Sequence, residues 1–322
     1  MKLITYDCNG RITIGKLVGS TVIDLHASSS SLPTTLLALL QAGPAAMDKV
    51  QALDVLHAVT LPLSDVHLLA PIPNPGTYMA IGMNYTKHVA EAVEAGFKIP
   101  DTQVWFNKQV ACINGPYAPV HMPSVSDKLD YEVELCVVIG KRCRNVKAAD
   151  AHSVIAGYMV CNDVTVRDWQ IRSPTMTMGK SFNTTGPIGP WLVTADEIPD
   201  PHALTLRMYV NGELRQQEST GGMVYNIWQQ IEHLSTAFTL QPGDLIATGT
   251  PSGVGIAMKP PQFLKVGDVM RAEVSGIGFI ENRVIAEPDY EVEEEFSDGP
   301  PLGKLAPSGG SAVRKATSVG AI

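Results

Sequence analysis

Acidic side chains occupy alternate positions of the stretch 130–134 (DYEVE), which leads directly into an apolar run. This pattern predicts a strand with Glu132 and Glu134 side by side on one face. Asn162-Asp163, further along the chain, offers a third carboxylate from a neighbouring segment. Three convergent carboxylates repel one another unless a cation neutralises them. The stretch therefore predicts either a site for Mg²⁺, Mn²⁺ or Ca²⁺, or a solvated acidic strand edge.

Length, charge and cysteine content narrow the possible partners. The 322 residues, 45% of them hydrophobic, suffice for one large domain with a small appendage. The net charge of −8 argues against nucleic acid as a partner. No apolar run approaches the roughly 18 residues that span a bilayer, so no membrane partner is expected. Five scattered cysteines without a CxxC pair indicate a reduced, cytoplasmic setting.

Residues 1–70 are expected to form a small N-terminal α/β domain. Pro71, Pro73 and Pro75 follow it as a stiff linker. Alternating apolar residues between Gly turns predict strands, and a later 3.6-residue period predicts helices. The strands are expected at residues 2–6, 12–17 and 21–25, and the helices at residues 36–40 and 47–55.

Residues 71–290 are expected to form the main domain, with many short strands and few helices. Strands are predicted at residues 134–139, 204–210 and 270–274, with Gly or Pro turns between such runs. The fold class is therefore α+β, mainly β, with peripheral helices. Residues 297–322 are rich in Gly, Pro, Ser and Ala, which predicts a flexible tail. One amphipathic helix is predicted from the apolar stripe Val224, Ile227, Trp228, Ile231 and Leu234.

His88 and Glu91 lie three residues apart in the polar stretch 81–91. On a helical turn they share a face and can form a hydrogen bond. A histidine held by a carboxylate is a typical general base for activating water. The alternative is an ordinary surface pair. Gly82 just upstream would allow the segment to act as a mobile lid.

Asp163, Arg167 and Gln170 stand at positions i, i+4 and i+7. A helical turn that begins near Asp163 would place all three on one face, with Asp163 toward a metal and the other two toward substrate. The alternative is a helix start capped by Asn162 or Asp163, with a surface arginine.

Two Gly-rich segments complete the set. Lys180 lies in the stretch 178–190 between Gly and Pro residues, where an ammonium group would stabilise an enolate or a carboxylate. A solvated lysine is the alternative. Thr250 lies in the stretch 247–255, which lacks the Lys-[Ser/Thr] of a phosphate loop, and Pro251 removes a backbone donor. We reject nucleotide binding and expect a tight loop that offers donors to a carboxylate.

From about Pro71 to Pro288, these motifs in this order resemble the fumarylacetoacetate hydrolase family. The resemblance implies a bacterial-type member with a small N-terminal domain and a mixed β-roll or β-barrel core. It also implies a homodimer with one Mg²⁺ or Mn²⁺ per subunit. The motifs that carry it lie at residues 84–91, 130–134, 162–170, 179–181 and 248–253.

The resemblance also implies roles for individual residues. Glu132, Glu134 and Asp163 match the family's metal ligands, and His88 with Glu91 matches its lid dyad. Catalysis is assigned to His88, Glu91 and Lys180. Contact with the small keto-acid substrate is assigned to Tyr85, Arg167, Gln170 and Thr250, together with Lys180.

We expect a metal-dependent hydrolase that splits a C–C bond of a 2,4-dioxo acid, such as an acylpyruvate or fumarylpyruvate, into pyruvate and a carboxylic acid. His88 would activate the water, Gln170 would bind the oxyanion, and Lys180 would hold the pyruvate enolate. Oxaloacetate decarboxylation or tautomerisation, and isomerisation of 2-hydroxyhepta-2,4-diene-1,7-dioate, use the same enolate and stay open. A non-catalytic binding protein with this fold is the remaining alternative.

Overall fold

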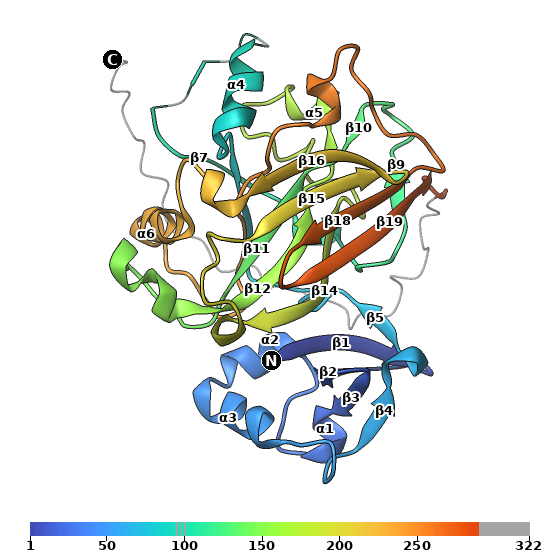
Figure 1. The fold of residues 1–322 in the computed structure, drawn as a ribbon, viewed down its shortest axis with the longest axis vertical. Helices are drawn as coiled ribbons and strands as arrows, with labels where there is room; N and C mark the ends of the chain where they lie inside the picture. Colours follow the sequence, from blue (N-terminus) through green and yellow to red (C-terminus); the bar gives the residue numbers. More distant parts are fainter. Residues whose placement is uncertain (95, 97, 100, 290–322) are drawn as a thin grey trace, which may run out of the picture. The chain divides into compact units, whose positions relative to one another are not determined.

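A twelve-stranded sheet crosses the protein in a computed structural model that describes residues 1–94, 96, 98, 99 and 101–289 (Figure 1). The strand order is β4-β3-β2-β1-β14-β12-β11-β17-β6-β7, with β5 paired to β1 and β8 to β14. The strands are β1 (Lys2–Cys8), β2 (Arg11–Val18), β3 (Thr21–Asp24), β4 (Thr60–Pro62), β5 (His67–Leu69), β6 (Tyr78–Gly82), β7 (Val104–Asn107), β8 (Ile113–Asn114), β11 (Val133–Ile139), β12 (Ile155–Asn162), β14 (Gly186–Thr194) and β17 (Leu245–Ala247).

Two smaller sheets and short helices complete the described fold. A five-stranded sheet has the order β16-β15-β18-β19-β9, and β10 pairs with β13. The further strands are β9 (Val120–Met122), β10 (Leu129–Asp130), β13 (Thr165–Val166), β15 (Thr205–Val210), β16 (Glu213–Ser219), β18 (Val269–Val274) and β19 (Gly278–Ala286). The α-helices are α1 (Leu25–Ser28), α2 (Leu36–Gln41), α3 (Pro44–Ala52), α4 (Thr86–Glu94), α5 (Arg167–Gln170) and α6 (Ile227–Ala237). The 3₁₀ turns are η1 (Leu63–Asp65), η2 (Val110–Cys112), η3 (Ala148–Val154), η4 (Ala195–Glu197), η5 (Thr220–Gly222) and η6 (Gly255–Ala257).

This architecture confirms the mainly β, α+β class. The central sheet ends at β4 and β7 without closing, so the described strands form no closed barrel. Strands and helices expected within residues 1–70 are all present. Lys2 of β1 pairs with Val193 of β14, so the central sheet continues across the proposed boundary at residue 70. The domain boundaries stay predictions, and the tail 297–322 lies outside the described residues.

Strand β11 positions the site because it lies at the centre of the sheet and is buried along its whole length. Its side chains alternate between two apolar cores. Leu135 and Val137 pack into the core shared with the five-stranded sheet. Cys136 and Val138 pack into the core shared with the N-terminal strands. A strand clamped on both faces makes a rigid base for the acidic residues at its beginning.

Helix α6 confirms the predicted amphipathic helix but begins later than expected. Asn226 and Gln229 form a reciprocal capping box at its start. Val224 therefore precedes the helix, and its side chain is exposed. The N-cap decides the start because the apolar spacing alone does not specify where the backbone turns.

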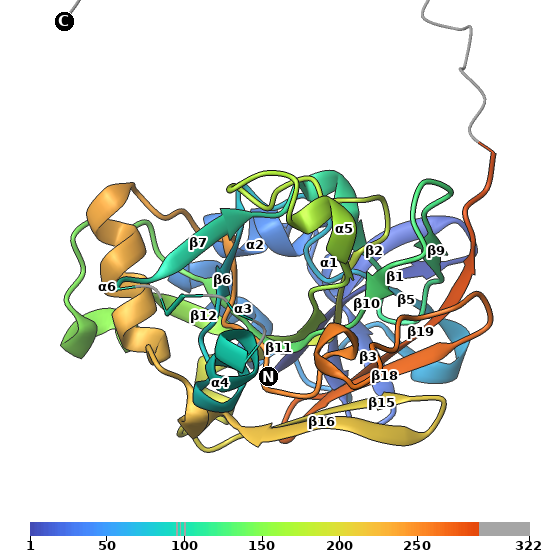
Figure 2. The ribbon, with the colours of Figure 1, turned by 90° about the horizontal axis from the view of Figure 1, so that it is seen from above.

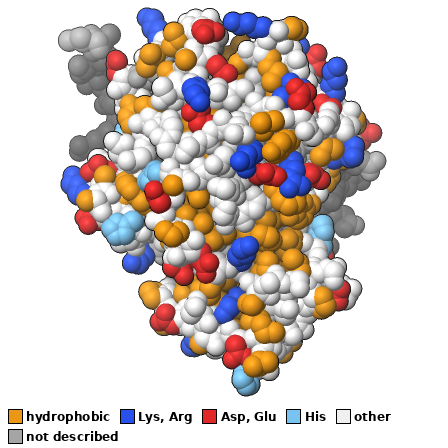
Figure 3. Space-filling model, viewed as in Figure 1, with side chains coloured by type: hydrophobic (Ala, Val, Ile, Leu, Met, Phe, Trp, Pro, Cys, Tyr) orange, Lys and Arg blue, Asp and Glu red, His pale blue; other side chains and the backbone are white. Residues whose placement is uncertain are grey.

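The five-stranded sheet buries one face and exposes the other. Charged side chains of both signs are intermixed over the exposed face (Figure 3). Arg271 lies 2.6 Å from Glu273 and 3.8 Å from Glu281. This alternation is typical of an antiparallel sheet with one solvated side. Among the described residues, no helix has the length and apolar character needed to cross a membrane.

Candidate metal centre and active site

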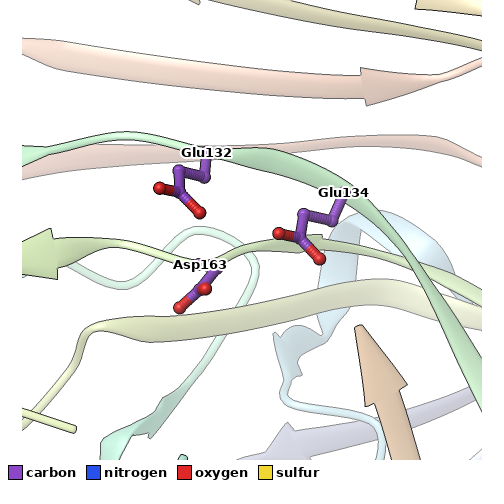
Figure 4. Close-up of side chains that lie close together, drawn as sticks. All are labelled: Glu132, Glu134 and Asp163. Carbon is purple, nitrogen blue, oxygen red and sulfur yellow. The ribbon is translucent and has the colours of Figure 1, made fainter. Parts of the chain in front are cut away.

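Glu132, Glu134 and Asp163 converge as the sequence predicts. Their nearest carboxylate oxygens all lie within 4.8 Å of one another, and all three side chains are buried. Figure 4 shows the three side chains lying close together, with Glu132 and Glu134 on one segment and Asp163 on its neighbour. Two hydrogen bonds hold β11 and β12 in this register: Glu132 N donates to Asn162 Oδ1 (2.9 Å), and Asp163 N donates to Glu132 O (2.9 Å).

Two buried lysines neutralise part of this charge. Lys180 Nζ lies 2.9 Å from Glu132 Oε2 and 2.7 Å from Asp163 Oδ2. Lys108 Nζ lies 2.7 Å from Asp163 Oδ1 and also donates to the backbone oxygens of Lys180 and Thr185. Lys180 is therefore not the solvated lysine of the alternative reading. Asp163 accepts from two ammonium groups at once.

The three carboxylates differ in electrostatic environment. Burial alone would raise the pKa of Glu132, but the charges of Lys180 and Arg167 lower it to about 2. Burial and the nearby charge of Asp163 raise the pKa of Glu134 well above its ordinary value. Glu134 Oε2 accepts a hydrogen bond from Gly249 N at 2.7 Å. Glu134 is thus the carboxylate that most lacks a positive partner.

This donor set fits a divalent cation. Three buried carboxylates supply the hard oxygen ligands that Mg²⁺ and Mn²⁺ prefer. The missing positive charge beside Glu134 is what such an ion would provide. Glu132, Glu134 and Asp163 are the residues that could hold it.

The His88–Glu91 pair lies on α4, as expected from its spacing. His88 Nδ1 lies 3.1 Å from Glu91 Oε2, and the His88 side chain is 17% exposed. Glu91 Oε1 accepts from Gly253 N at 2.9 Å, which ties α4 to the loop after β17. Glu91 therefore orients the imidazole and leaves Nε2 as the nitrogen available to a substrate.

Helices α4 and α5 lie at the end of the molecule opposite the N-terminal strands (Figure 1). Figure 2 looks onto this end, where β11 passes between the two helices in projection. Asn84, just before α4, donates to Thr248 O (2.8 Å) and Tyr225 O (3.0 Å). Gly249 has φ +98°, and a Cβ there would lie 2.7 Å from the Asn84 Cβ. Only glycine permits this close approach of the loop to the segment before α4.

Arg167 reaches the site from α5. Its Nε lies 2.8 Å from Asp130 Oδ2, and its Nη1 lies 2.6 Å from Glu132 and 3.1 Å from Gln170 Oε1. Nη2 is buried and has no hydrogen-bond partner within the described ranges. An unpaired buried guanidinium nitrogen is a ready donor to a substrate carboxylate.

The expected helical turn from Asp163 is wrong. Residues 165–166 form β13 and pair with β10, so α5 begins only at Arg167. Asp163, Arg167 and Gln170 therefore do not share one helix face. Arg167 and Gln170 still contact each other. Arg167 is linked to Asp163 through Glu132 and Lys180, because Lys180 bridges those two carboxylates.

Tyr85 and Thr250, which are also assigned to substrate contact, differ in the hydrogen bonding of their hydroxyl groups. The Tyr85 hydroxyl is buried without a hydrogen-bond partner in the described part of the chain. Burial and Glu134 raise the Tyr85 pKa well above its ordinary value. The Thr250 hydroxyl is already engaged, donating to Val133 O (3.0 Å) and accepting from Gln216 (2.8 Å). The substrate roles of both residues stay predictions.

Sequence reasoning missed Lys108 and the full role of Asp130. Lys108 directly follows β7, and no motif spacing relates it to Asp163. Asp130 belongs to the acidic stretch, yet its carboxylate accepts from Gly255 N (2.8 Å), Ile256 N (2.9 Å) and Arg167. It organises the loop and the arginine, whereas its neighbours at alternate positions face the metal centre.

Known proteins resemble this chain over most of its length. The family model described as "Fumarylacetoacetate (FAA) hydrolase C-terminal" matches residues 77–285. The mitochondrial oxaloacetate tautomerase FAHD2B of Bos taurus is 42% identical over 269 residues, which cover 83% of this chain and 85% of that protein.

Solved structures share the fold. The fumarylacetoacetate hydrolase of Exiguobacterium antarcticum matches with a TM-score of 0.78 and 34% identity, over 89% of this chain and 100% of that one. A maleylpyruvate hydrolase of Sphingobium sp. SYK-6, solved with manganese(II) ion and pyruvate, matches with a TM-score of 0.75 and 30% identity over the same shares. These likenesses confirm the fold expected from the sequence motifs.

Proposed function

The chain belongs to the fumarylacetoacetate hydrolase family, and from this we propose that it interconverts the keto and enol forms of a 2-oxo diacid of the oxaloacetate type. The observation that carries the proposal is an oriented histidine close to two buried cationic side chains. His88 is oriented by Glu91, and Lys180 with Arg167 surrounds Glu132. Identity of 42% to an oxaloacetate tautomerase supports this reaction.

The substrate is held, and the negative charge that develops on it is stabilised, by three sets of groups. A divalent cation held by Glu132, Glu134 and Asp163 would supply Lewis acidity toward the keto oxygen. The free Nη2 of Arg167 donates to a substrate carboxylate. The Lys180 ammonium group stabilises the negative charge that develops on the 2-oxygen.

Proton transfer is assigned to His88. With its Nδ1 proton directed at Glu91, the neutral imidazole accepts a proton from C3 of the keto form at Nε2. The protonated His88 then gives this proton from Nε2 to the 2-oxygen, which completes the enol and restores the neutral imidazole, and the reverse sequence restores the ketone. The bonds broken and formed are C–H and O–H only, so no water is consumed.

Hydrolysis of a 2,4-dioxo acid is the second candidate. The partial exposure of His88 favours it, because a water molecule can reach the imidazole. His88 would deprotonate that water for attack on C4, and cleavage of C3–C4 would leave pyruvate enolate and a carboxylic acid. The likeness to a maleylpyruvate hydrolase supports this alternative.

The two reactions can be distinguished by experiment, because hydrolysis consumes water and releases pyruvate, whereas tautomerisation does neither. We expect Mg²⁺- or Mn²⁺-dependent acceleration of the loss of enol-oxaloacetate absorbance, without pyruvate release from acylpyruvates. His88→Ala should slow it by about 10²–10⁴-fold. Glu94→Gln, an exposed change on the same helix, should leave it unchanged. Pyruvate release from acylpyruvates or fumarylpyruvate, with no effect on the enol, would favour hydrolysis instead.

Absence of both activities with added metal would contradict the enzymatic proposal. It would leave a binding protein with this fold. We also propose that the protein is a homodimer in solution, as the family resemblance implies. Light scattering at micromolar concentration measures this directly.

A further inference from the structure

A cavity of about 650 Å³ lies apart from the metal centre. It opens between the segment 122–128, the end of β15 and the loop 261–268. Its volume falls within the range of small-molecule sites in proteins. The residues that line it in the described structure include none of the three acidic residues and neither member of the dyad.

The walls combine an apolar surface with positive charge. Phe263, Leu264 and Val266 supply apolar contacts from the loop. Lys128 and Lys265 add two ammonium groups, and Lys128 Nζ lies 5.0 Å from the Phe263 ring centroid. A ligand with an apolar body and an anionic end matches this lining.

The two carboxylates at the cavity already have partners. Asp268 accepts from Lys265 N at 2.7 Å and from Asn211 Nδ2 at 2.8 Å. Asp127 lies at the exposed rim, 3.1 Å from Lys128 Nζ. Their remaining repulsion toward an anion is therefore weaker than the number of carboxylates suggests.

Arg215 adds a third cationic side chain to the lining of the cavity. Its Nη1 donates to Gln262 Oε1 at 2.7 Å, and its Nη2 lies 2.9 Å from Glu213 Oε2. Its Nε is buried and has no hydrogen-bond partner among the residues described.

The cavity is connected to the dyad through the backbone of one residue, Gly253. Tyr131, which lines the cavity, donates its hydroxyl hydrogen to Gly253 O at 3.1 Å. Gly253 N donates to Glu91 at 2.9 Å. Arg215 packs against the same glycine, since a Cβ on Gly253 would lie 2.1 Å from the Arg215 backbone oxygen. Both residues that face the cavity therefore position the residue that holds Glu91.

We propose that this cavity binds a small carboxylate with an apolar body, and that its occupancy steadies the Gly253 peptide and hence the Glu91–His88 pair. The coupling of the two sites is then reciprocal, as linkage requires. The binding claim stands independently of the reaction, whereas the effect on turnover rests on the proposed function.

Benzoate is the probe, with the full-length protein loaded with Mn²⁺ and saturated with oxalate to occupy the metal centre. Saturation-transfer NMR measures binding, and hydrogen exchange follows the peptide that contains Gly253. We expect benzoate to bind in the presence of oxalate and to slow exchange at Gly253. Val266→Trp, which fills the cavity from an exposed position, should weaken binding about tenfold or more.

Matched changes elsewhere control for general effects. Val59→Trp places the same side chain at another exposed valine and should leave benzoate binding unchanged. Lys265→Met should weaken binding, and Lys141→Met should not. Displacement of benzoate by oxalate would overturn the proposal, as would unchanged binding in Val266→Trp or no binding at all. If the wild-type protein binds benzoate but shows no keto–enol activity, only the proposed reaction is refuted.

Discussion

Lys108 Nζ lies 2.7 Å from Asp163 Oδ1, and neither side chain is exposed to solvent. Lys108→Met would leave Asp163 with one ammonium partner and would free two backbone acceptors. Breaking a buried ion pair from one side typically costs about 3–5 kcal/mol. We expect the free energy of unfolding of the metal-free protein to fall by that amount in urea titrations. Lys141→Met should change it by less than about 0.5 kcal/mol. A loss below about 1 kcal/mol for Lys108→Met would contradict this account.

Gly253→Ala tests the support of Glu91. The added Cβ would lie 2.1 Å from the Arg215 backbone oxygen at φ +100°, so the loop must move and the Gly253 amide must leave Glu91. We expect kcat to fall about tenfold or more while Mn²⁺ affinity changes little, because the hydrogen bonds that Gly253 makes in the described structure go to Glu91 and Tyr131 and not to the three acidic residues. Gly267→Ala has nearly the same φ, +101°, with nothing within 4 Å, and isolates the backbone strain. Equal losses of kcat in both variants would refute the positioning role.

The acidic residues could be predicted because their geometry is local. Alternate residues of a strand share a face, which brings Glu132 and Glu134 together, and spacing by three on α4 brings His88 to Glu91. The neighbouring segment after β12 then supplies Asp163. In each case, the sequence pattern itself encodes which side chains can meet.

Other features depend on packing between distant segments. Lys108 reaches Asp163 only because β7 and β12 belong to the same sheet, which no periodicity reveals. The helical turn expected from Asp163 fails because Val166 pairs with Leu129. The pairing of β1 with β14 likewise joins segments far apart in the chain. Local patterns predict elements, whereas the partners of those elements follow from the tertiary fold.

His202 predicts a pH dependence of stability. Its Nε2 accepts from Ile227 N at 3.1 Å at the start of α6, and burial lowers the pKa of His202. The unfolded chain therefore takes up the proton more readily than the native one. This contribution is fully present above the ordinary histidine pKa near 6.5 and is lost as the pH falls through the lower native pKa.

His202→Gln keeps an acceptor near Ile227 but removes the titration. We expect its urea stability to depend less on pH than that of the wild type between about pH 7.5 and 5.5. His57→Gln, at an exposed position, should retain the wild-type slope. Parallel pH profiles for wild type and His202→Gln would show that His202 does not contribute.

Glu134→Gln should not destabilise the protein without metal, but it should make the protein less stable than the wild type when Mn²⁺ is added. Without metal, burial and Asp163 raise the pKa of Glu134, so a neutral amide that can still accept from Gly249 removes an electrostatic cost. We expect the variant to melt at or above the wild-type temperature in EDTA. With Mn²⁺ at 100 times its dissociation constant, the wild type should gain about 2.7 kcal/mol, and the variant should gain much less. Glu281→Gln, at an exposed position, should follow the wild type in both conditions. A variant that Mn²⁺ stabilises as strongly as the wild type would exclude Glu134 as a ligand.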